Sequence, residues 1–290
     1  MSRPVETGRT APDPAAEMGR VVIGDIQLAY RERDSGGRHY LQRGHVEEYH
    51  SPLYPLLRRV LAPELCIDIG ANYGFTGLVL RRVFPESRLV LVEPIPWLEA
   101  YVRHNFAINS EAMPSFHSAI CSASTPDARS CFGLRQTGTQ DSRVIPQEGM
   151  EVIETDVVTL EQLTSDVGPQ QGVFIKIDTQ GWEARVFAGG ETFLASHGAW
   201  FIKTEFAPQW LESQGTDPID FLRWLLARFA VHESLGRVRW SCNTLDEAIG
   251  APLRDEDAAA FVTYVRALAR ADKGWIDLYV LPPRARRRYG

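Results

Sequence analysis

The sequence predicts an α/β fold with an open, mostly parallel sheet of seven strands, and three observations carry this prediction. First, the short apolar run Leu65–Ile69 is interrupted only by Asp68 and leads through a glycine turn into a helical pattern. A run of this length that ends in glycine is typical of a parallel strand buried on both faces. Second, strand and helix patterns alternate through most of the chain. Third, the last apolar run, Trp275–Leu281, fits a final strand antiparallel to the others.

The remaining elements follow from apolar periodicity and from residues that mark boundaries. Pro94 and Pro96 delay the helix after the second strand, and Asp217 with Pro218 marks a helix start as N-cap and first residue. Thr159 is the expected N-cap of another helix. We expect further strands at 88–92, 115–121, 152–158, 173–177, 198–205 and 229–234. We expect helices at 97–109, at 217–228 and within 246–272, one helix that starts at 159, and one whose last residues are 191–196.

Four segments are expected along the chain. They are a disordered tail at 1–19, an extension at 20–62, a ligand-binding domain at 63–283 and a solvated, Arg-rich tail at 284–290. Within the extension we expect a strand pair, or one strand with a turn at Gly24–Asp25, followed by a polar segment with a turn at Ser35–Gly37. A helical pattern from His45 to Leu61 then predicts a helix that covers the ligand cleft.

Composition and charge exclude several classes of protein. The 290 residues are 44% hydrophobic and 23% charged, which is ordinary for a globular protein with a large core. A net charge of −6 argues against a nucleic-acid partner, which needs a basic face. No stretch has the roughly 18 apolar residues of a membrane span, and the N-terminus lacks the apolar segment of a signal peptide. Four cysteines without a C-x-x-C pair suit a reducing compartment, so we expect a cytoplasmic protein without a membrane partner.

The turn after the first strand predicts a nucleotide-like ligand. Gly70 and Gly74 allow a sharp turn and a close approach of the ligand to the backbone, at the sheet edge where open α/β folds bind ligands. A dinucleotide is disfavoured because its pyrophosphate would lie near Asp68, and like charges repel. S-adenosylmethionine has no phosphate and carries two cationic groups, so it suits Asp68 unless this residue is only a cap. Glu93, after the second strand, is placed to bind the ribose diol of either ligand.

Several motifs recur together in the order of one known family. D-I-G-A-N-Y-G begins at Asp68, V-E-P contains Glu93, Asn105 and Asn109 end a helix, and K-I-D-x-x-G-W-E spans Lys176–Glu183. From about residue 66 to 234 the sequence resembles the FkbM family of S-adenosylmethionine-dependent methyltransferases. The resemblance implies the class I methyltransferase fold, a Rossmann-like seven-stranded sheet with an antiparallel last strand, here with a small N-terminal extension.

The resemblance also implies a cofactor, S-adenosylmethionine, with S-adenosylhomocysteine as product, and a set of site residues. The implied cofactor contacts are Asp68, Gly70, Ala71, Asn72, Gly74, Phe75, Thr76, Glu93, Pro94, Ser118 and Ala119. On sequence grounds alone, Asp178 and Glu183 are acids that cap or precede a helix start. The family motif makes a functional role as reasonable as this structural role for both residues. The polar segment 136–143 resembles the turn of a family hairpin, for which we expect a substrate-side role.

The implied reaction is methylation of an oxygen, in this family commonly a hydroxyl of a natural product or a sugar, so the expected partner is a small-molecule acceptor. An alcohol keeps its proton at neutral pH, and a positioned carboxylate or histidine assists its removal by roughly 10²–10⁴-fold. The candidates are Asp178, Glu205 and His104, in that order. A divalent metal between the two acids is the less favoured alternative, because no dense acidic motif demands one.

Other functions stay open on the sequence alone. A nicotinamide-dependent oxidoreductase would use Asn72–Gly77 as its phosphate turn, although this turn lacks the first glycine of the dinucleotide fingerprint. A binding module would retain the cofactor fold without turnover. The sequence identifies neither the acceptor nor the oligomeric state, and it is compatible with a homo-oligomer.

Overall fold

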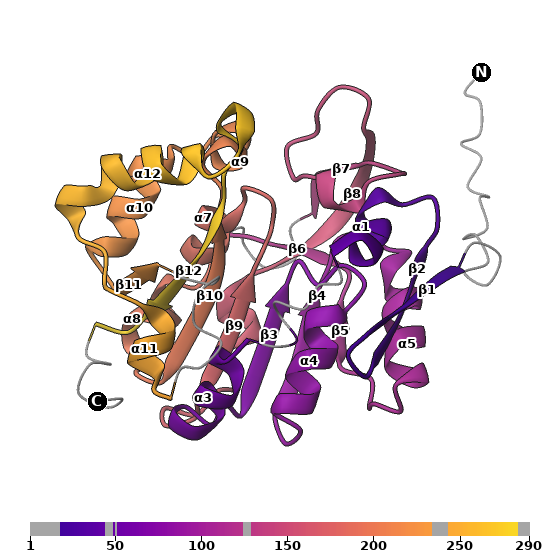
Figure 1. The fold of residues 1–290 in the computed structure, drawn as a ribbon, viewed down its shortest axis with the longest axis horizontal. Coiled ribbons are helices and arrows are strands. Elements are labelled where there is room, and N and C mark those ends of the chain that lie inside the picture. The colour runs from indigo at the N-terminus through magenta and orange to yellow at the C-terminus, as the bar shows by residue number, and fades with distance from the viewer. Residues whose placement is uncertain (1–17, 44–48, 50, 124–128, 234–242, 284–290) are drawn as a thin grey trace.

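A seven-stranded sheet forms the centre of the molecule (Figure 1). The computed structural model describes residues 18–43, 49, 51–123, 129–233 and 243–283, and the expected tail residues 1–17 and 284–290 lie outside these ranges. In spatial order the strands are β11 (Ala230–Glu233), β12 (Ile276–Leu281), β10 (Trp200–Phe206), β9 (Val173–Ile177), β3 (Leu65–Ile69), β4 (Arg88–Val92) and β5 (Ser115–His117). As predicted, β12 runs antiparallel to both neighbours and the other pairs are parallel.

Alternation along β3 divides its side chains between two cores. Leu65, Ile67 and Ile69 face one core and Cys66 faces the other, because successive side chains of a strand point to opposite faces of the sheet. All five residues of β3 are buried, as expected for a central parallel strand. Asp68 lies on the Cys66 face and is fully buried, so its carboxylate needs a charged partner.

Helices cover both faces of the sheet, and two of the expected caps are confirmed. The Cys66 face carries α3 (Leu53–Val60), α4 (Phe75–Val83), α5 (Leu98–Ile108) and α11 (Leu245–Ile249). The other face carries α6 (Leu160–Leu163), α7 (Glu183–Ala188), α8 (Glu191–Ser196), α9 (Pro208–Ser213), α10 (Pro218–Leu226) and α12 (Ala258–Ala267). Thr159 forms a capping box with Gln162, and Asp217 accepts from two amides of α10. No helix among the described residues is long and apolar enough to cross a membrane.

The strand predicted at 115–121 is in fact two strands in two sheets. β5 ends at His117, and β6 (Ala119–Cys121) pairs with β8 (Glu151–Val158) in a three-stranded sheet completed by β7 (Arg129–Leu134). The prediction was wrong because neither Gly nor Pro marks the break. Pairing with β8 sets it instead, and the Thr155 hydroxyl donates to the Ser118 carbonyl at the junction (3.3 Å). β7 and β8 form the hairpin that the family resemblance implied.

The N-terminal extension starts with the predicted strand pair, β1 (Met18–Ile23) and β2 (Ile26–Arg31). The turn predicted at 35–37 was wrong, since α1 (Ser35–Arg43) begins there. The Asp34 carboxylate accepts from the amides of Gly36 and Gly37 (3.3 and 2.9 Å), which supports a helix start despite two glycines. Of the helix predicted at 45–61, α3 forms residues 53–60, while 44–48 and 50 lie outside the described ranges. α3 packs against α4 and α11 and not at the ligand edge of the sheet.

Candidate active site

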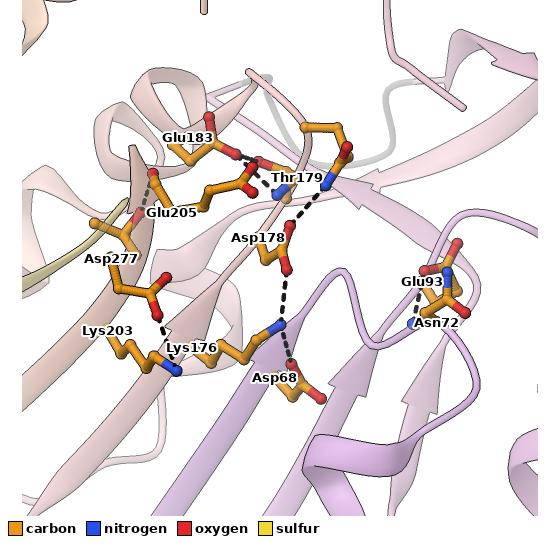
Figure 2. Close-up of polar contacts among 12 residues, drawn as sticks. Asp68, Asn72, Glu93, Lys176, Asp178, Thr179, Glu183, Lys203, Glu205 and Asp277 are labelled. Atoms are coloured by element: carbon orange, nitrogen blue, oxygen red, sulfur yellow. Dashed lines mark hydrogen bonds and ion pairs between the residues drawn. The ribbon is translucent and has the colours of Figure 1, made fainter. Parts of the chain in front are cut away.

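A cavity of about 400 Å³ lies at the carboxyl ends of β3, β4, β9 and β10, the edge at which open α/β sheets bind ligands. Figure 2 shows that its polar residues form two groups. The Glu93 side consists of Asn72 and Glu93, next to the glycine turn. The Glu205 side consists of Lys176, Asp178, Lys203, Glu205 and Asp277.

The turn between β3 and α4 brings bare backbone to the cavity. Gly70 and Gly74 have positive φ angles of 85° and 80°, which strain any residue with a side chain. A Cβ added to Gly70 would also lie 1.8 Å from the carbonyl oxygen of Asp178. Only glycine fits at this position, and through it the glycine turn packs against the backbone directly after β9.

Glu93 is buried at the end of β4, and both of its oxygens accept from the backbone. The amide of Asn72 donates to Oε2 and the amide of Ile95 donates to Oε1, each at 3.0 Å. Burial raises the pKa of Glu93 to about 7, while the two amide bonds act in the opposite direction. Glu93 thus holds the glycine turn, and each oxygen keeps a second lone pair for a ligand hydroxyl.

The structure brings most of the predicted cofactor residues to the cavity. Eight of them line it: Gly70, Ala71, Asn72, Phe75, Thr76, Glu93, Pro94 and Ala119. Asp68, Gly74 and Ser118 do not. Gly74 shapes the turn as the N-cap residue of α4, and Ser118 marks the break between β5 and β6. Asp68 is fully buried and lies 3.5 Å from the Nζ of Lys176, which lines the cavity. Its contact with a ligand stays a prediction.

Lys176 joins two acids that lie at neighbouring strand ends (Figure 2). Its Nζ is 3.5 Å from Asp68 Oδ1 and 3.3 Å from Asp178 Oδ2. The Gln180 side chain donates to the other Asp178 oxygen (2.9 Å). A fully buried carboxylate is costly without a cation, so Lys176 compensates Asp68. It also orients Asp178, whose side chain is 35% exposed and lines the cavity.

Glu183 organises the loop that follows β9 rather than the cavity wall. It is buried, and its Oε1 accepts from the Thr179 amide (2.9 Å), the Thr179 hydroxyl (3.0 Å) and the Gly181 amide (3.2 Å). Burial raises the pKa of Glu183 to about 7, and these hydrogen bonds lower it. Glu183 therefore fixes the backbone next to Asp178 without lining the cavity.

Glu205 lies beside Asp178 because β9 and β10 pair with Lys176 opposite Lys203. Burial, and then the charges of Asp178, Glu183 and Asp277, raise the pKa of Glu205 well above its ordinary value, while Lys176 lowers it. Among the described residues, nothing forms a hydrogen bond with its buried Oε2. Glu205 thus offers a polar group to a ligand on this side of the cavity.

Lys203 and Asp277 belong to the site but were missed by the sequence analysis. Lys203 Nζ lies 3.1 Å from Asp277 Oδ2, and both residues line the cavity. A signal for Lys203 did exist. The pattern lysine, any residue, acid occurs near the carboxyl ends of both β9 and β10, and the period of two of a strand puts the lysine and the acid on the same side. Asp277 had no such signal, since its place depends on the pairing of β12 with β10.

Aromatic residues and the β7–β8 hairpin complete the wall. The aromatic members are Tyr40, Phe75, Phe132, Trp182, Trp210 and Trp275. Of the segment 136–143, for which a substrate-side role was expected, Thr139, Gln140 and Ser142 line the cavity. The Arg143 guanidinium lies 4.4 Å from the ring centre of Trp210 on α9, and this contact ties the hairpin to the far side of the cavity.

His104 does not reach the cavity, although the sequence analysis named it as a candidate base. It lies on α5, where burial and the nearby Arg20 lower its pKa. Its neighbours Asn105 and Asn109 bind the backbone of β2 and so hold the extension on the domain. Because a base must come within hydrogen-bond reach of the proton that it removes, the catalytic candidates are Asp178 and Glu205.

The donor set does not suit the divalent metal that was kept as an alternative. Among the residues that the structure describes, no group of three or more His, Cys, Asp or Glu side chains is arranged to hold a metal ion. Lys176 also contacts Asp178 directly, so a cation already faces this carboxylate.

The strand order, the antiparallel last strand and the glycine turn at the carboxyl edge define the class I fold of S-adenosylmethionine-dependent methyltransferases. The family model "Methyltransferase FkbM domain" matches residues 68–236, more than half of the chain. The protein therefore belongs to the FkbM methyltransferase family, as its motifs indicated.

Solved structures similar to this chain are distant in sequence. The methyltransferase FkbM from Methylobacillus flagellatus KT is 16% identical over 80% of this chain and 49% of that chain (TM-score 0.41), so the present chain spans about half its length. The plantazolicin methyltransferase BamL, solved with a triazolic desmethylPZN analog and SAH, is 13% identical over 85% and 89% of the two chains (TM-score 0.44). A precorrin-6y C5,15-methyltransferase from Geobacter metallireducens GS-15 is 10% identical over 86% and 95% (TM-score 0.42). None of the curated proteins compared with the chain matches it.

Proposed function

We propose that the protein transfers a methyl group from S-adenosylmethionine to a hydroxyl oxygen of a small-molecule acceptor, a natural product or a sugar. One observation carries this proposal: Asp178 and Glu205 end adjacent strands and line the cavity on the side opposite Glu93. An acceptor that keeps its proton at neutral pH needs a carboxylate that takes up this proton, whereas a nucleophile without such a proton does not.

The Glu93 side fits the cofactor. Gly70 lines the cavity with bare backbone, and Glu93 has acceptor capacity left for a ribose diol. Ala119, Ile120 and Cys121 present small or apolar side chains where an adenine ring would lie. When bound, S-adenosylmethionine supplies an electrophilic methyl carbon.

The Glu205 side aligns the acceptor and handles its proton. Asp178, oriented by Lys176 and Gln180, accepts the hydroxyl proton as the acceptor oxygen becomes nucleophilic. Glu205, whose pKa is raised well above its ordinary value by burial and by the neighbouring acids, offers its buried Oε2 to a second polar group of the acceptor. Aromatic residues line the cavity wall, and alignment of donor and acceptor accounts for much of the rate of such a displacement.

The test combines calorimetry with a panel of acceptors. Purified protein is titrated with S-adenosylmethionine, S-adenosylhomocysteine and NAD, and then incubated with labelled S-adenosylmethionine and acceptors that offer a hydroxyl, an amine or an activated carbon. We expect binding of the first two ligands and label transfer only to hydroxyls. Binding of NAD alone would overturn the assignment of S-adenosylmethionine as cofactor. Label on nitrogen or carbon would overturn the assignment of O-methylation.

The proposal includes a cytoplasmic enzyme without nucleic-acid or membrane partners. The net charge of −6 and the cysteine usage support this part of it. Cys66 and Cys121 are buried thiols, and burial raises the pKa of each to about 12, so both stay protonated.

A further inference from the structure

One buried acid, Asp34, connects the N-terminal extension with the glycine turn between β3 and α4 and with the β7–β8 hairpin. Asp34 precedes α1, is fully buried and does not line the cavity. Its two carboxylate oxygens accept five hydrogen bonds from three segments that are far apart in the sequence. So many donors on one buried carboxylate hold those segments in a fixed arrangement, because bonds to a charged acceptor are stronger than neutral ones.

The donors come from each segment in turn. Gly36 and Gly37 donate from the extension (3.3 and 2.9 Å). The Tyr73 hydroxyl donates from the glycine turn (2.7 Å), and both the amide and the hydroxyl of Thr139 donate from the hairpin (2.8 Å each). Burial and the neighbouring Asp34 raise the pKa of Tyr73, so its phenol remains a donor.

The same segments form the cavity wall around the Glu93 side. Tyr40 of α1, Asn72 of the turn and Thr139 of the hairpin all line the cavity. The Asn72 side chain donates to the Thr139 hydroxyl (3.2 Å), and the Asn72 amide donates to Glu93 (3.0 Å). A continuous set of hydrogen bonds therefore runs from Asp34 through Thr139 and Asn72 to Glu93.

We propose that Asp34 is a positioning residue of the cofactor site, which fixes Asn72 and the glycine turn against Glu93 before the cofactor binds. The inference rests on the cofactor assignment made under the proposed function. A site that is ordered in advance binds more tightly because less conformational entropy is lost on binding. The extension is then part of the cofactor site and not an appendage to it.

Two variants and one control test this role. Asp34→Asn keeps the side-chain shape but leaves one of the two acceptor oxygens. Tyr73→Phe removes one donor to Asp34 and, with it, the acceptor of the Arg31 amide (3.3 Å). The control, Thr164→Val, removes the hydroxyl of a similarly buried residue that bonds the Leu160 carbonyl (2.8 Å) away from the cavity. The measurements are melting temperature, S-adenosylhomocysteine affinity by calorimetry, and hydrogen exchange of residues 70–76 without ligand.

For Asp34→Asn we expect hydrogen exchange of residues 70–76 to be at least tenfold faster and S-adenosylhomocysteine to bind at least tenfold more weakly. For Tyr73→Phe we expect a change of about threefold in each of these two quantities. Thr164→Val should lower the melting temperature without either effect. If Asp34→Asn does not fold, Tyr73→Phe decides. Exchange and affinity within a factor of 1.5 of wild type, or an equal loss in Thr164→Val, would overturn the role of Asp34. If the wild type itself does not bind S-adenosylhomocysteine, the cofactor assignment fails, and the exchange data still decide whether Asp34 orders the turn.

Discussion

The two sides of the cavity differ in the groups that fix their carboxylates. Glu93 accepts from two backbone amides, so the fold itself supplies its partners. Asp178 is held by the side chains of Lys176 and Gln180, and Glu205 has an oxygen that no described residue bonds. Only a substitution to proline removes a backbone donor, whereas many substitutions remove a side-chain donor. Under the proposed function, the Glu93 side binds the cofactor and the Glu205 side binds the acceptor.

The largest effect is expected on the Glu205 side, for Asp178→Asn. If Asp178 is the base, the variant should lower kcat by roughly 10²–10⁴-fold, because only the proton transfer is lost. Affinity for S-adenosylmethionine should stay within about twofold, since Lys176 and Gln180 still surround an isosteric side chain. Steady-state kinetics with the identified acceptor and calorimetry with the cofactor measure the two quantities.

The matched control for this prediction is Asp217→Asn. Asp217 caps α10 and lies outside the cavity, and asparagine caps about as well. We expect an unchanged kcat in the control. Normal turnover of Asp178→Asn at low temperature, together with early melting, would make Asp178 a structural acid and leave Glu205 as the catalytic candidate.

On the Glu93 side, Gly70→Ala tests whether bare backbone is required. The new Cβ would meet the Asp178 carbonyl at 1.8 Å in a backbone conformation with φ of 85°, so we expect a loss of about 2–4 kcal/mol in the free energy of unfolding. Denaturant unfolding measures this loss. Gly198→Ala is the control, because a Cβ there meets nothing within 4 Å. Equal stability of the two variants would show that the turn adapts and that the contact with β9 is not needed.

This contrast also explains how much the sequence could predict. The strand at 65–69, its glycine turn and the caps Thr159 and Asp217 depend on neighbouring residues, and all were predicted. On the Glu93 side, Asn72 lies within the glycine turn, and Glu93 was predicted from its place directly after the second strand. Family motifs added Asp178, which the structure places in the cavity wall.

The errors and omissions concern contacts between distant segments. The break at Ser118 follows from the pairing of β6 with β8, and the start of α1 at Ser35 depends on Asp34, whose five donors include two from Thr139. His104 was placed by its position near a helix end, but the face of that helix on which it lies is set by packing against β2. Asp277 enters the site only because the last strand pairs with β10.

A smaller effect is expected for Glu93→Ala, which distinguishes binding from catalysis. Loss of a charge-assisted hydrogen bond to the ribose should weaken S-adenosylmethionine binding by roughly 1.5–3 kcal/mol, or about 10- to 150-fold. Because that bond is made equally in the ground and transition states, kcat at saturating cofactor should change little. Calorimetry and kinetics test the two statements separately. A large fall in kcat with normal cofactor affinity would remove Glu93 from the cofactor site.

The remaining effect is on the pH dependence of stability, and it compares two buried acids. The pKa of Glu183 is raised from 4.5 to about 7 in the folded protein. Its contribution to stability is therefore fully present below pH 4.5 and is lost as the pH rises through 7, because the folded state binds the proton more tightly than the unfolded state. Unlike Glu93, which needs both oxygens for amides, Glu183 accepts its three bonds at Oε1 alone.

Glu183→Gln should consequently keep those three bonds through the amide oxygen while removing the charge. We expect equal stability of variant and wild type near pH 4.5 and a variant more stable by about 3 kcal/mol at pH 8, where the wild type carries a buried charge. Denaturant unfolding at several pH values measures the difference, with Glu191→Gln, an exposed acid in the first turn of α8, as the control that should show none. A difference between Glu183→Gln and wild type that does not change between pH 4.5 and 8 would mean that Glu183 does not ionise in this range. The cost of the variant would then lie in the hydrogen bonds of the loop beside Asp178, and the loop would depend on the carboxylate itself.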